Sequence, residues 1–195
     1  MVAIGLFVAC NLSGYMLIGF INSYGTKNLG QSSSTMLMVS MVGSVSWGVP
    51  TVLAARGSDC VGRRRTYVVG AVVLGAWAFP FFLLLDTADG ALMVLAVVGL
   101  TVGLRLTSDP QAATYAEMFP APVRYSGASL AYAVGVVLGG GFAPPVAAWL
   151  VGTTGSSLPV SAYMLFSCLR TFLAALALRE RSADENDAFV RDMGA

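Results

Sequence analysis

Mostly uncharged apolar stretches of about 20 residues recur along this 195-residue chain and constrain its fold more than any other feature. A helix of roughly 20 apolar residues crosses the hydrocarbon core of a bilayer. Membrane strands are excluded, because the stretches are too long and their polarity does not alternate strictly. We therefore predict an all-α integral membrane protein with six transmembrane helices, at residues 3–24, 35–55, 66–85, 91–118 (kinked), 126–151 and 158–178.

The composition excludes several classes of function. Charged residues make up 11% of the chain, whereas about 25% is usual for a soluble domain. A soluble enzyme is therefore nearly excluded, and a net charge of +1 does not suggest a nucleic-acid partner. The chain has no histidine and three widely spaced cysteines, so it offers no metal-ligand pattern and no histidine-based catalysis. We predict no enzymatic activity, no cofactor and no bound metal.

The basic residues predict how the chain is oriented. The links on the opposite side of the predicted bundle contain one basic residue, Lys27. Arginines accumulate on the cytoplasmic side of membrane proteins, so both termini are expected in the cytoplasm, at the plasma (inner) membrane. Residues 1–181 then form one six-span domain, and residues 182–195 form a cytoplasmic tail. The arginines in the cytoplasmic links and tail are Arg56, Arg63, Arg64, Arg65, Arg124, Arg179, Arg181 and Arg191.

The link after the second predicted span combines an acid, a glycine and an arginine cluster. A carboxylate such as Asp59 accepts charge-assisted hydrogen bonds from arginine or from a helix N-terminus. Gly62 permits a tight turn, and Arg63 and Arg64 follow it directly. This pattern indicates a gating latch at the membrane face. The alternative is that the arginines only anchor the link in the cytoplasm.

A second acid–arginine pair lies in the next cytoplasmic link. Glu117 and Arg124 flank Pro120 and Pro122, which end the preceding helix. The pair is a candidate for a second latch at the same face. The alternative is an exposed ion pair, which contributes little free energy.

The fourth predicted span contains both an arginine and an aspartate. Arg105 and Asp109 are four residues apart and therefore share one helix face. Charges inside a membrane are costly and generally line a cavity or a proton path. We interpret them as a substrate or proton site, which Gln111 and Tyr115 extend towards the cytoplasm. The alternatives are a self-satisfied ion pair, or a span that ends at Leu104 and leaves both charges in water.

Polar residues of the first span form a stripe. Asn11, Tyr15 and Asn22 follow spacings of four and seven, and Tyr132 of the fifth span is a further candidate for the same cavity. Such a stripe can bind a polar metabolite, although hydrogen bonding between helices explains it about as well. Trp47, with the other tryptophans, is expected to serve packing or interfacial anchoring.

Several of these segments resemble a known family. Residues 59–65 resemble the signature loop of the Major Facilitator Superfamily. Residues 110–144 are similar to its metabolite:proton symporter family, which includes shikimate, proline/betaine and dicarboxylate-type carriers, and so are residues 23–26 and 155–163. The resemblance covers essentially the whole chain, aligned to spans seven to twelve of that family.

The resemblance implies a function and a partner. Such transporters consist of two six-span halves around a site near the bilayer midplane, so this chain corresponds to the C-terminal half. The resemblance implies proton-coupled uptake of a small organic acid or zwitterion by alternating access, with membrane lipid and the missing N-terminal six-span half as partners. Two alternatives remain: a truncated or half-length product with no transport of its own, and a half-transporter that associates with a second copy.

Overall fold

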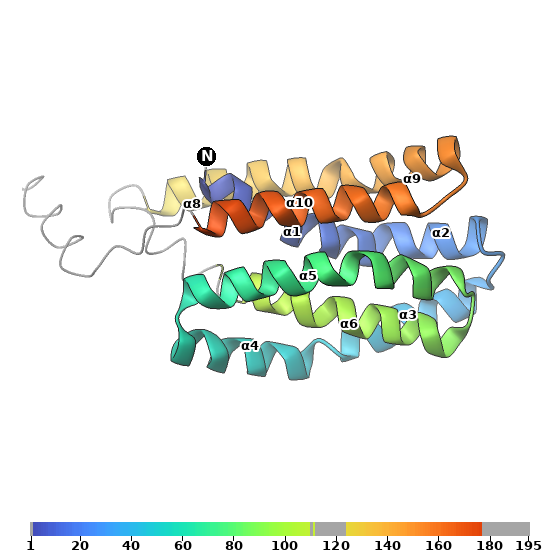
Figure 1. The fold of residues 1–195 in the computed structure, drawn as a ribbon, viewed down its shortest axis with the longest axis horizontal. Coiled ribbons are helices and arrows are strands. Elements are labelled where there is room, and N and C mark those ends of the chain that lie inside the picture. Colours follow the sequence, from blue (N-terminus) through green and yellow to red (C-terminus); the bar gives the residue numbers. More distant parts are fainter. Residues whose placement is uncertain (1, 110, 112–123, 177–195) are drawn as a thin grey trace, which may run out of the picture.

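The described residues of the computed structural model are 2–109, 111 and 124–176, and their regular structure is entirely helical. The predicted all-α class is thus confirmed. The helices run along one long axis and form a bundle (Figure 1). In chain order they are α1 (Val2–Tyr15), η1 (Met16–Phe20), α2 (Ile21–Lys27), α3 (Ser33–Val45), α4 (Gly48–Val61), α5 (Arg63–Asp86), α6 (Gly90–Ser108), α8 (Arg124–Gly135), η2 (Val136–Gly141), α9 (Ala143–Thr154) and α10 (Leu158–Leu176).

Five helical segments of the described residues are long and apolar enough to cross a membrane. They overlap the second to sixth predicted spans, and the ends that can be compared differ by at most three residues except at the end of the fourth. Of the fourth predicted span, residues 110 and 112–118 lie outside the described residues. The first predicted span, residues 3–24, is helical along its length but is not among the five, so its crossing stays a prediction. The five are Ser33–Ser58, Arg64–Asp86, Gly90–Ser108, Tyr125–Thr154 and Leu158–Leu176.

Local sequence signals set several helix ends. The Ser32 hydroxyl accepts a hydrogen bond from the Thr35 amide at 3.1 Å and begins α3. The Asp89 carboxylate accepts from the Ala91 amide at 2.8 Å and begins α6. Both are side-chain caps, which satisfy amides that have no partner within the helix. Gly62, with φ of +98°, separates α4 from α5, so the tight turn predicted at this glycine is confirmed.

Two of the long helices contain a π-helical segment. The segment η1 lies between α1 and α2, and η2 lies between α8 and α9. A π-helical turn adds a residue to the helix and redirects the side chains around it, and such turns are frequent at functional sites. Tyr15 stands immediately before η1. The prolines Pro144 and Pro145 occupy the first turn of α9, where a missing amide hydrogen has no cost.

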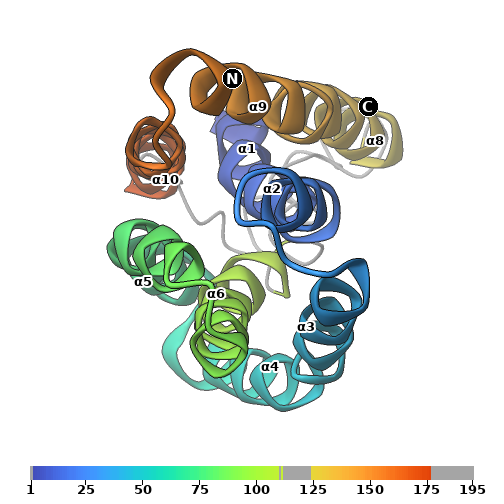
Figure 2. The ribbon, with the colours of Figure 1, turned by 90° about the vertical axis from the view of Figure 1, so that its right-hand side faces the viewer.

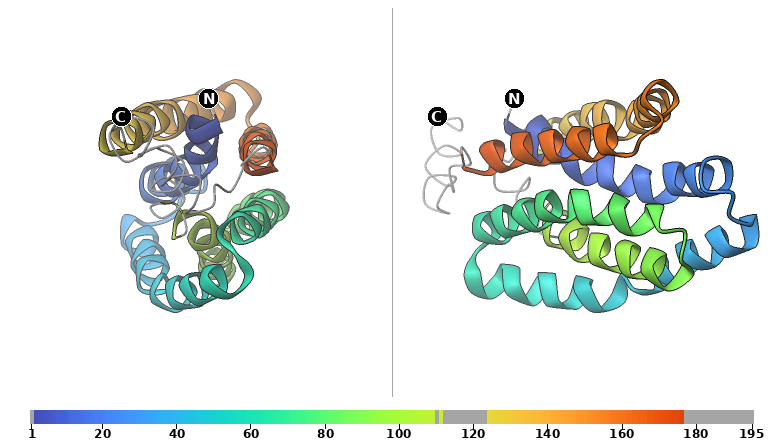
Figure 3. Two further views of the ribbon diagram at one scale, coloured as in Figure 1. Left: turned by 90° about the vertical axis from the view of Figure 1, so that its left-hand side faces the viewer. Right: turned by 45° about the vertical axis from the view of Figure 1, so that its right-hand side comes forward.

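The helices α1 and α2 lie in the middle of the bundle. Seen along its axis, they have α8, α9 and α10 on one side and α3, α5 and α6 on the other (Figures 2 and 3). Glycines permit close contacts between neighbours: a Cβ at Gly103 would stand 2.9 Å from the Leu74 amide nitrogen, and one at Gly139 would stand 2.6 Å from the Val8 carbonyl oxygen. Close helix approach of this kind is typical of membrane bundles.

One carboxylate connects three helices at the end of the bundle away from the α4–α5 turn. Asp86, at the end of α5, accepts a hydrogen bond from the Tyr24 hydroxyl at 2.6 Å. Its other oxygen accepts from the Ser157 hydroxyl, just before α10. Because Tyr24 lies in α2, Asp86 ends α5 and Ser157 immediately precedes α10, these bonds hold the ends of the three helices together.

Candidate functional site

A cavity of about 250 Å³ lies between α1, α6 and α8, and we call it the Arg105 pocket. It brings together five of the residues predicted as a substrate or proton path, from three helices far apart in sequence. They are Asn11, Tyr15, Arg105, Gln111 and Tyr132. Its other lining residues are Cys10, Gly14, Ile18, Trp47, Leu104 and Ser108.

Arg105 is held in place by two contacts. Its Nη1 lies 3.3 Å from Asp109 Oδ1, one turn further along the chain, as the spacing of four predicted. Its guanidinium carbon lies 4.3 Å from the centre of the Trp47 ring. A guanidinium over an indole face is attracted by the ring's negative charge distribution. The ion pair alone therefore does not account for the position of Arg105.

Several buried polar atoms at this place have no hydrogen-bond partner among the described residues. Two belong to the ion pair itself, Arg105 Nε and Asp109 Oδ2, and two belong to neighbours, Trp47 Nε1 and Gln111 Nε2. Buried polar groups are normally paired, and an unpaired one costs about 1–3 kcal/mol. Among the described residues, the ion pair therefore leaves a polar atom of each partner without a hydrogen bond. Three of these residues, Trp47, Arg105 and Gln111, line the Arg105 pocket, which makes it a candidate site for a polar ligand.

On the α1 side of the pocket, Cys10 makes polar contacts with α6 and Gln111. It was not among the site residues predicted from the sequence. The Cys10 Sγ lies 2.9 Å from Ser108 Oγ and 3.9 Å from Gln111 Oε1. Ser108 follows Arg105 by three residues, so a search for polar neighbours on that helix face would have found it. Cys10 comes from a helix almost a hundred residues away and has no such signal.

The polar residues predicted to form one stripe on the first span lie in two different environments. Asn11 and Tyr15 line the Arg105 pocket, and the Tyr15 ring lies so close to Gly140 that a Cβ there would overlap it. Asn22 instead donates to the Ile18 carbonyl at 3.2 Å and accepts from the Ser40 hydroxyl at 3.0 Å. Hydrogen bonding between helices therefore explains Asn22.

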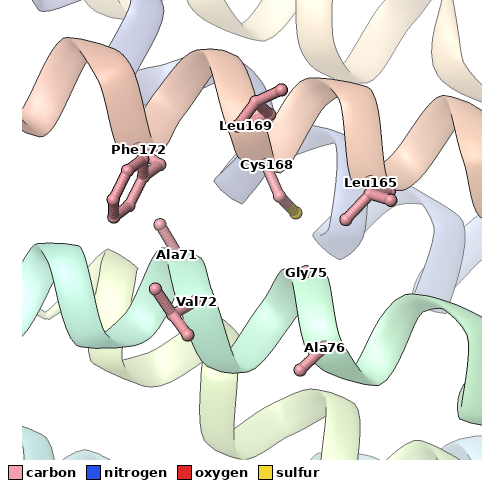
Figure 4. A pocket seen from close by; sticks show the side chains of 8 residues that line it. All are labelled: Ala71, Val72, Gly75, Ala76, Leu165, Cys168, Leu169 and Phe172. Atoms are coloured by element: carbon pink, nitrogen blue, oxygen red, sulfur yellow. The ribbon is translucent and has the colours of Figure 1, made fainter.

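A second cavity, of about 310 Å³, lies between α5 and α10 and is almost entirely apolar (Figure 4). Small residues of α5 face larger residues of α10, and the Cys168 thiol is its most polar side chain. It has no group that could recognise a charged or strongly polar solute, so the Arg105 pocket is the stronger candidate site. The lining residues are Ala71, Val72, Gly75, Ala76, Leu165, Cys168, Leu169 and Phe172.

The sequence matches the sugar (and other) transporter family over residues 1–188. The chain belongs to this family of the Major Facilitator Superfamily. The family consists of transporters, which agrees with the membrane-type helices. The superfamily predicted from residues 59–65 and 110–144 is thereby confirmed.

Relatives of this transporter family that resemble the chain carry different solutes. It is 33% identical to the shikimate transporter of Escherichia coli over 87% of its length. It is 28% identical to the proline/betaine transporter of Salmonella typhimurium over 91%, and 29% identical to the citrate-proton symporter of Klebsiella pneumoniae over 87%. The chain spans 39%, 35% and 38% of the lengths of these relatives.

The signature loop of this family member is described only in part. Arg64 donates from Nε to the Ala175 carbonyl at 3.2 Å and from Nη2 to the Leu176 carbonyl at 2.5 Å, so it binds the last turn of α10. The side chains of Asp59, Arg63 and Arg124, and the whole of Tyr115 and Glu117, lie outside the described residues. The latch therefore stays a prediction.

Proposed function

We propose that this chain forms the six-span C-terminal half of a secondary transporter in the plasma (inner) membrane, with both termini in the cytoplasm. The transporter takes up a small organic acid or zwitterion together with protons, by alternating access. The observation that carries the proposal is the Arg105 pocket, where an arginine lines a cavity together with residues that carry buried polar atoms without a partner among the described residues. Within membrane spans, charged residues in such a position mark solute and ion pathways.

The surroundings of the pocket support a missing partner half. Tyr15 and Tyr132 line the pocket and are 41% and 54% exposed, so the cavity is open on one side. Large apolar side chains of α3 and α4 are also exposed, with Met38 at 71% and Val45 at 79%. A second six-span half, as in other transporters of this superfamily, would cover the open side and complete the site.

The solute proposed follows from the arginine and from the relatives. A guanidinium matches the geometry of a carboxylate and binds it through paired hydrogen bonds. Shikimate, citrate, proline and betaine, which the names of the relatives mention, all carry a carboxylate. The name of one relative also contains proton symport, which supports coupling to protons.

Within this proposal, the Arg105–Asp109 pair connects solute and proton. Arg105 holds the solute carboxylate, and Asp109, whose Oδ1 lies 3.3 Å from Arg105 Nη1, accepts the coupled proton. Asp59, Gly62, Arg63, Arg64, Glu117 and Arg124 make and break contacts at the cytoplasmic face as the two halves rock.

The test is uptake of labelled shikimate, citrate and proline into proteoliposomes under an inward proton gradient. The chain is reconstituted alone and together with a six-span N-terminal half from a relative. We expect uptake only with both halves, abolished by a protonophore and by Arg105→Gln, and retained in Arg170→Gln. Arg170 is exposed on α10 and does not line the pocket, so it serves as the matched control.

The other outcomes decide between the alternatives. Uptake by the chain alone, accompanied by a homodimer in crosslinking, would replace this proposal with a self-associating half-transporter. Failure of uptake in every combination would favour a half-length product without transport activity. Uptake that Arg105→Gln leaves unchanged would remove the Arg105 pocket as the site.

A further inference from the structure

The ion pair beside the Arg105 pocket is oriented, with its positive end towards the cavity. Arg105 lines the cavity, whereas Asp109 does not. The described residues that line it include no carboxylate. A solute inside therefore meets a cation first, and Coulomb interactions at such short range are strong where little water screens them.

Three residues that line this cavity carry a buried hydrogen-bond donor atom without a partner among the described residues. Trp47 Nε1 and Arg105 Nε have no partner among the described residues, and both groups can only donate. Gln111 Nε2 is also without a partner in that part of the chain, and the residue is only 9% exposed. A ligand that satisfies these three atoms must bring acceptor oxygens. The one unpartnered acceptor, Asp109 Oδ2, belongs to a residue that does not line the cavity.

Of the three aromatic residues that line the pocket, Tyr132 is 54% exposed, whereas Trp47 and Tyr15 are already in contact with other groups and offer little to a positively charged solute. A quaternary ammonium has no hydrogen to donate and is recognised by open aromatic faces. A face of Trp47 is already covered by the Arg105 guanidinium at 4.3 Å. The Tyr15 ring is packed against the backbone of Gly140. A second cation at Trp47 would stand close to the charge of Arg105 and be repelled by it.

We propose that the Arg105 pocket selects small organic anions over zwitterions of the same shape. The inference deepens the proposed function and rests on it, since that function leaves both classes open. The carboxylate binds Arg105, and further acceptor oxygens of the anion receive hydrogen bonds from Trp47 and Gln111. An ammonium group on the solute loses affinity, because the lining provides a positive charge and no described carboxylate to pair with it.

Two pairs of isosteric solutes test this without changing shape. Glycine betaine is compared with 3,3-dimethylbutanoate, in which carbon replaces the charged nitrogen. L-proline is compared with cyclopentanecarboxylate, which keeps the ring and the carboxylate but lacks the ammonium group. Binding to the 195-residue chain in lipid nanodiscs is measured by titration calorimetry, alone and together with the N-terminal half.

We expect each anion to bind at least about tenfold more tightly than its zwitterionic partner. Arg105→Gln should remove this difference, while the exposed control Arg170→Gln should preserve it. Trp47→Phe keeps an aromatic face but loses the indole N–H, and it should weaken binding of both anions. Circular dichroism and thermal unfolding of each variant confirm that the fold is retained.

The outcomes separate the inference from the function on which it rests. Zwitterions that bind as tightly as the anions, or more tightly, would overturn the inference and leave the proposed transporter intact, provided that Arg105→Gln still weakens binding. Selectivity for anions that survives Arg105→Gln would overturn the role given to Arg105. Absence of binding by all four solutes, with and without the second half, would overturn both proposals.

Discussion

The Arg105 guanidinium lies 4.3 Å from the centre of the Trp47 ring, while its Nη1 is held 3.3 Å from Asp109 Oδ1. The arginine is thus fixed by a carboxylate and an indole face from different helices. A side chain held in this way loses little conformational freedom when it binds a solute. The arrangement therefore favours Arg105 as the residue that recognises the carboxylate.

Two substitutions of Arg105 distinguish the effect of its positive charge from the effect of its planar guanidinium group. Arg105→Lys keeps a positive charge but loses the planar group that stacks on Trp47 and binds carboxylates in two places. We expect affinity for an organic anion to fall about tenfold in Arg105→Lys and further in Arg105→Gln, as measured by calorimetry. Equal affinity in the lysine variant would show that charge alone, without stacking on Trp47, is sufficient.

Asp109→Asn tests the proton role proposed for that carboxylate. The amide cannot take up a proton but still offers an oxygen to Arg105 Nη1. We expect solute exchange without a gradient to continue, whereas accumulation driven by a proton gradient should be lost. Both are measured in the same proteoliposomes, with Asp89→Asn, at the opposite end of α6, as the comparison variant. Gradient-driven accumulation at the normal level in Asp109→Asn would assign the coupling to another group.

Gly139 and Gly141 both lie in η2, and the same alanine substitution can be compared at the two positions. A Cβ at Gly139 would stand 2.6 Å from the Val8 carbonyl oxygen and 3.2 Å from Asn11 Cβ, whereas one at Gly141 meets no atom within 4 Å. We expect Gly139→Ala to destabilise the bundle by about 1–3 kcal/mol and to disturb the wall that carries Asn11. Gly141→Ala should be nearly neutral. Thermal unfolding in detergent compares them, and equal melting temperatures would contradict this packing.

Alanine substitutions at Gly62 and at Gly57 test whether the turn of the signature loop requires glycine. Gly62 has φ of +98°, which L-residues rarely adopt, whereas Gly57 lies within α4, and neither would place a Cβ near other atoms. We expect Gly62→Ala to cost about 1–3 kcal/mol, while Gly57→Ala should be neutral or stabilising because alanine favours a helix. Unfolding of both variants in the same detergent measures the difference. A stable Gly62→Ala would mean that the turn can relax.

Much of the architecture was predictable because the signal for a membrane-spanning helix lies in consecutive residues of the sequence. About 20 consecutive apolar residues are sufficient to indicate a span, and five of the predicted segments overlap helices that are long and apolar enough to cross a membrane. The Arg105–Asp109 pair was equally predictable, because its partners are one helical turn apart. The role of Gly62 followed from its place between two helices and an arginine cluster.

The pocket was predictable only in part, because contacts between helices depend on how they pack. Cys10 and Trp47 join Arg105 from distant segments, and no spacing in the sequence connects them. The same holds for Asn22, whose partner Ser40 lies across a helix interface, and for Asp86, which joins Tyr24 to Ser157. The sequence by itself determined the helices, their approximate ends and the local ion pair, since these depend on hydropathy and helical periodicity. Only the tertiary structure decided which side chains meet in the pocket, because that depends on the rotation and close approach of helices from distant parts of the chain.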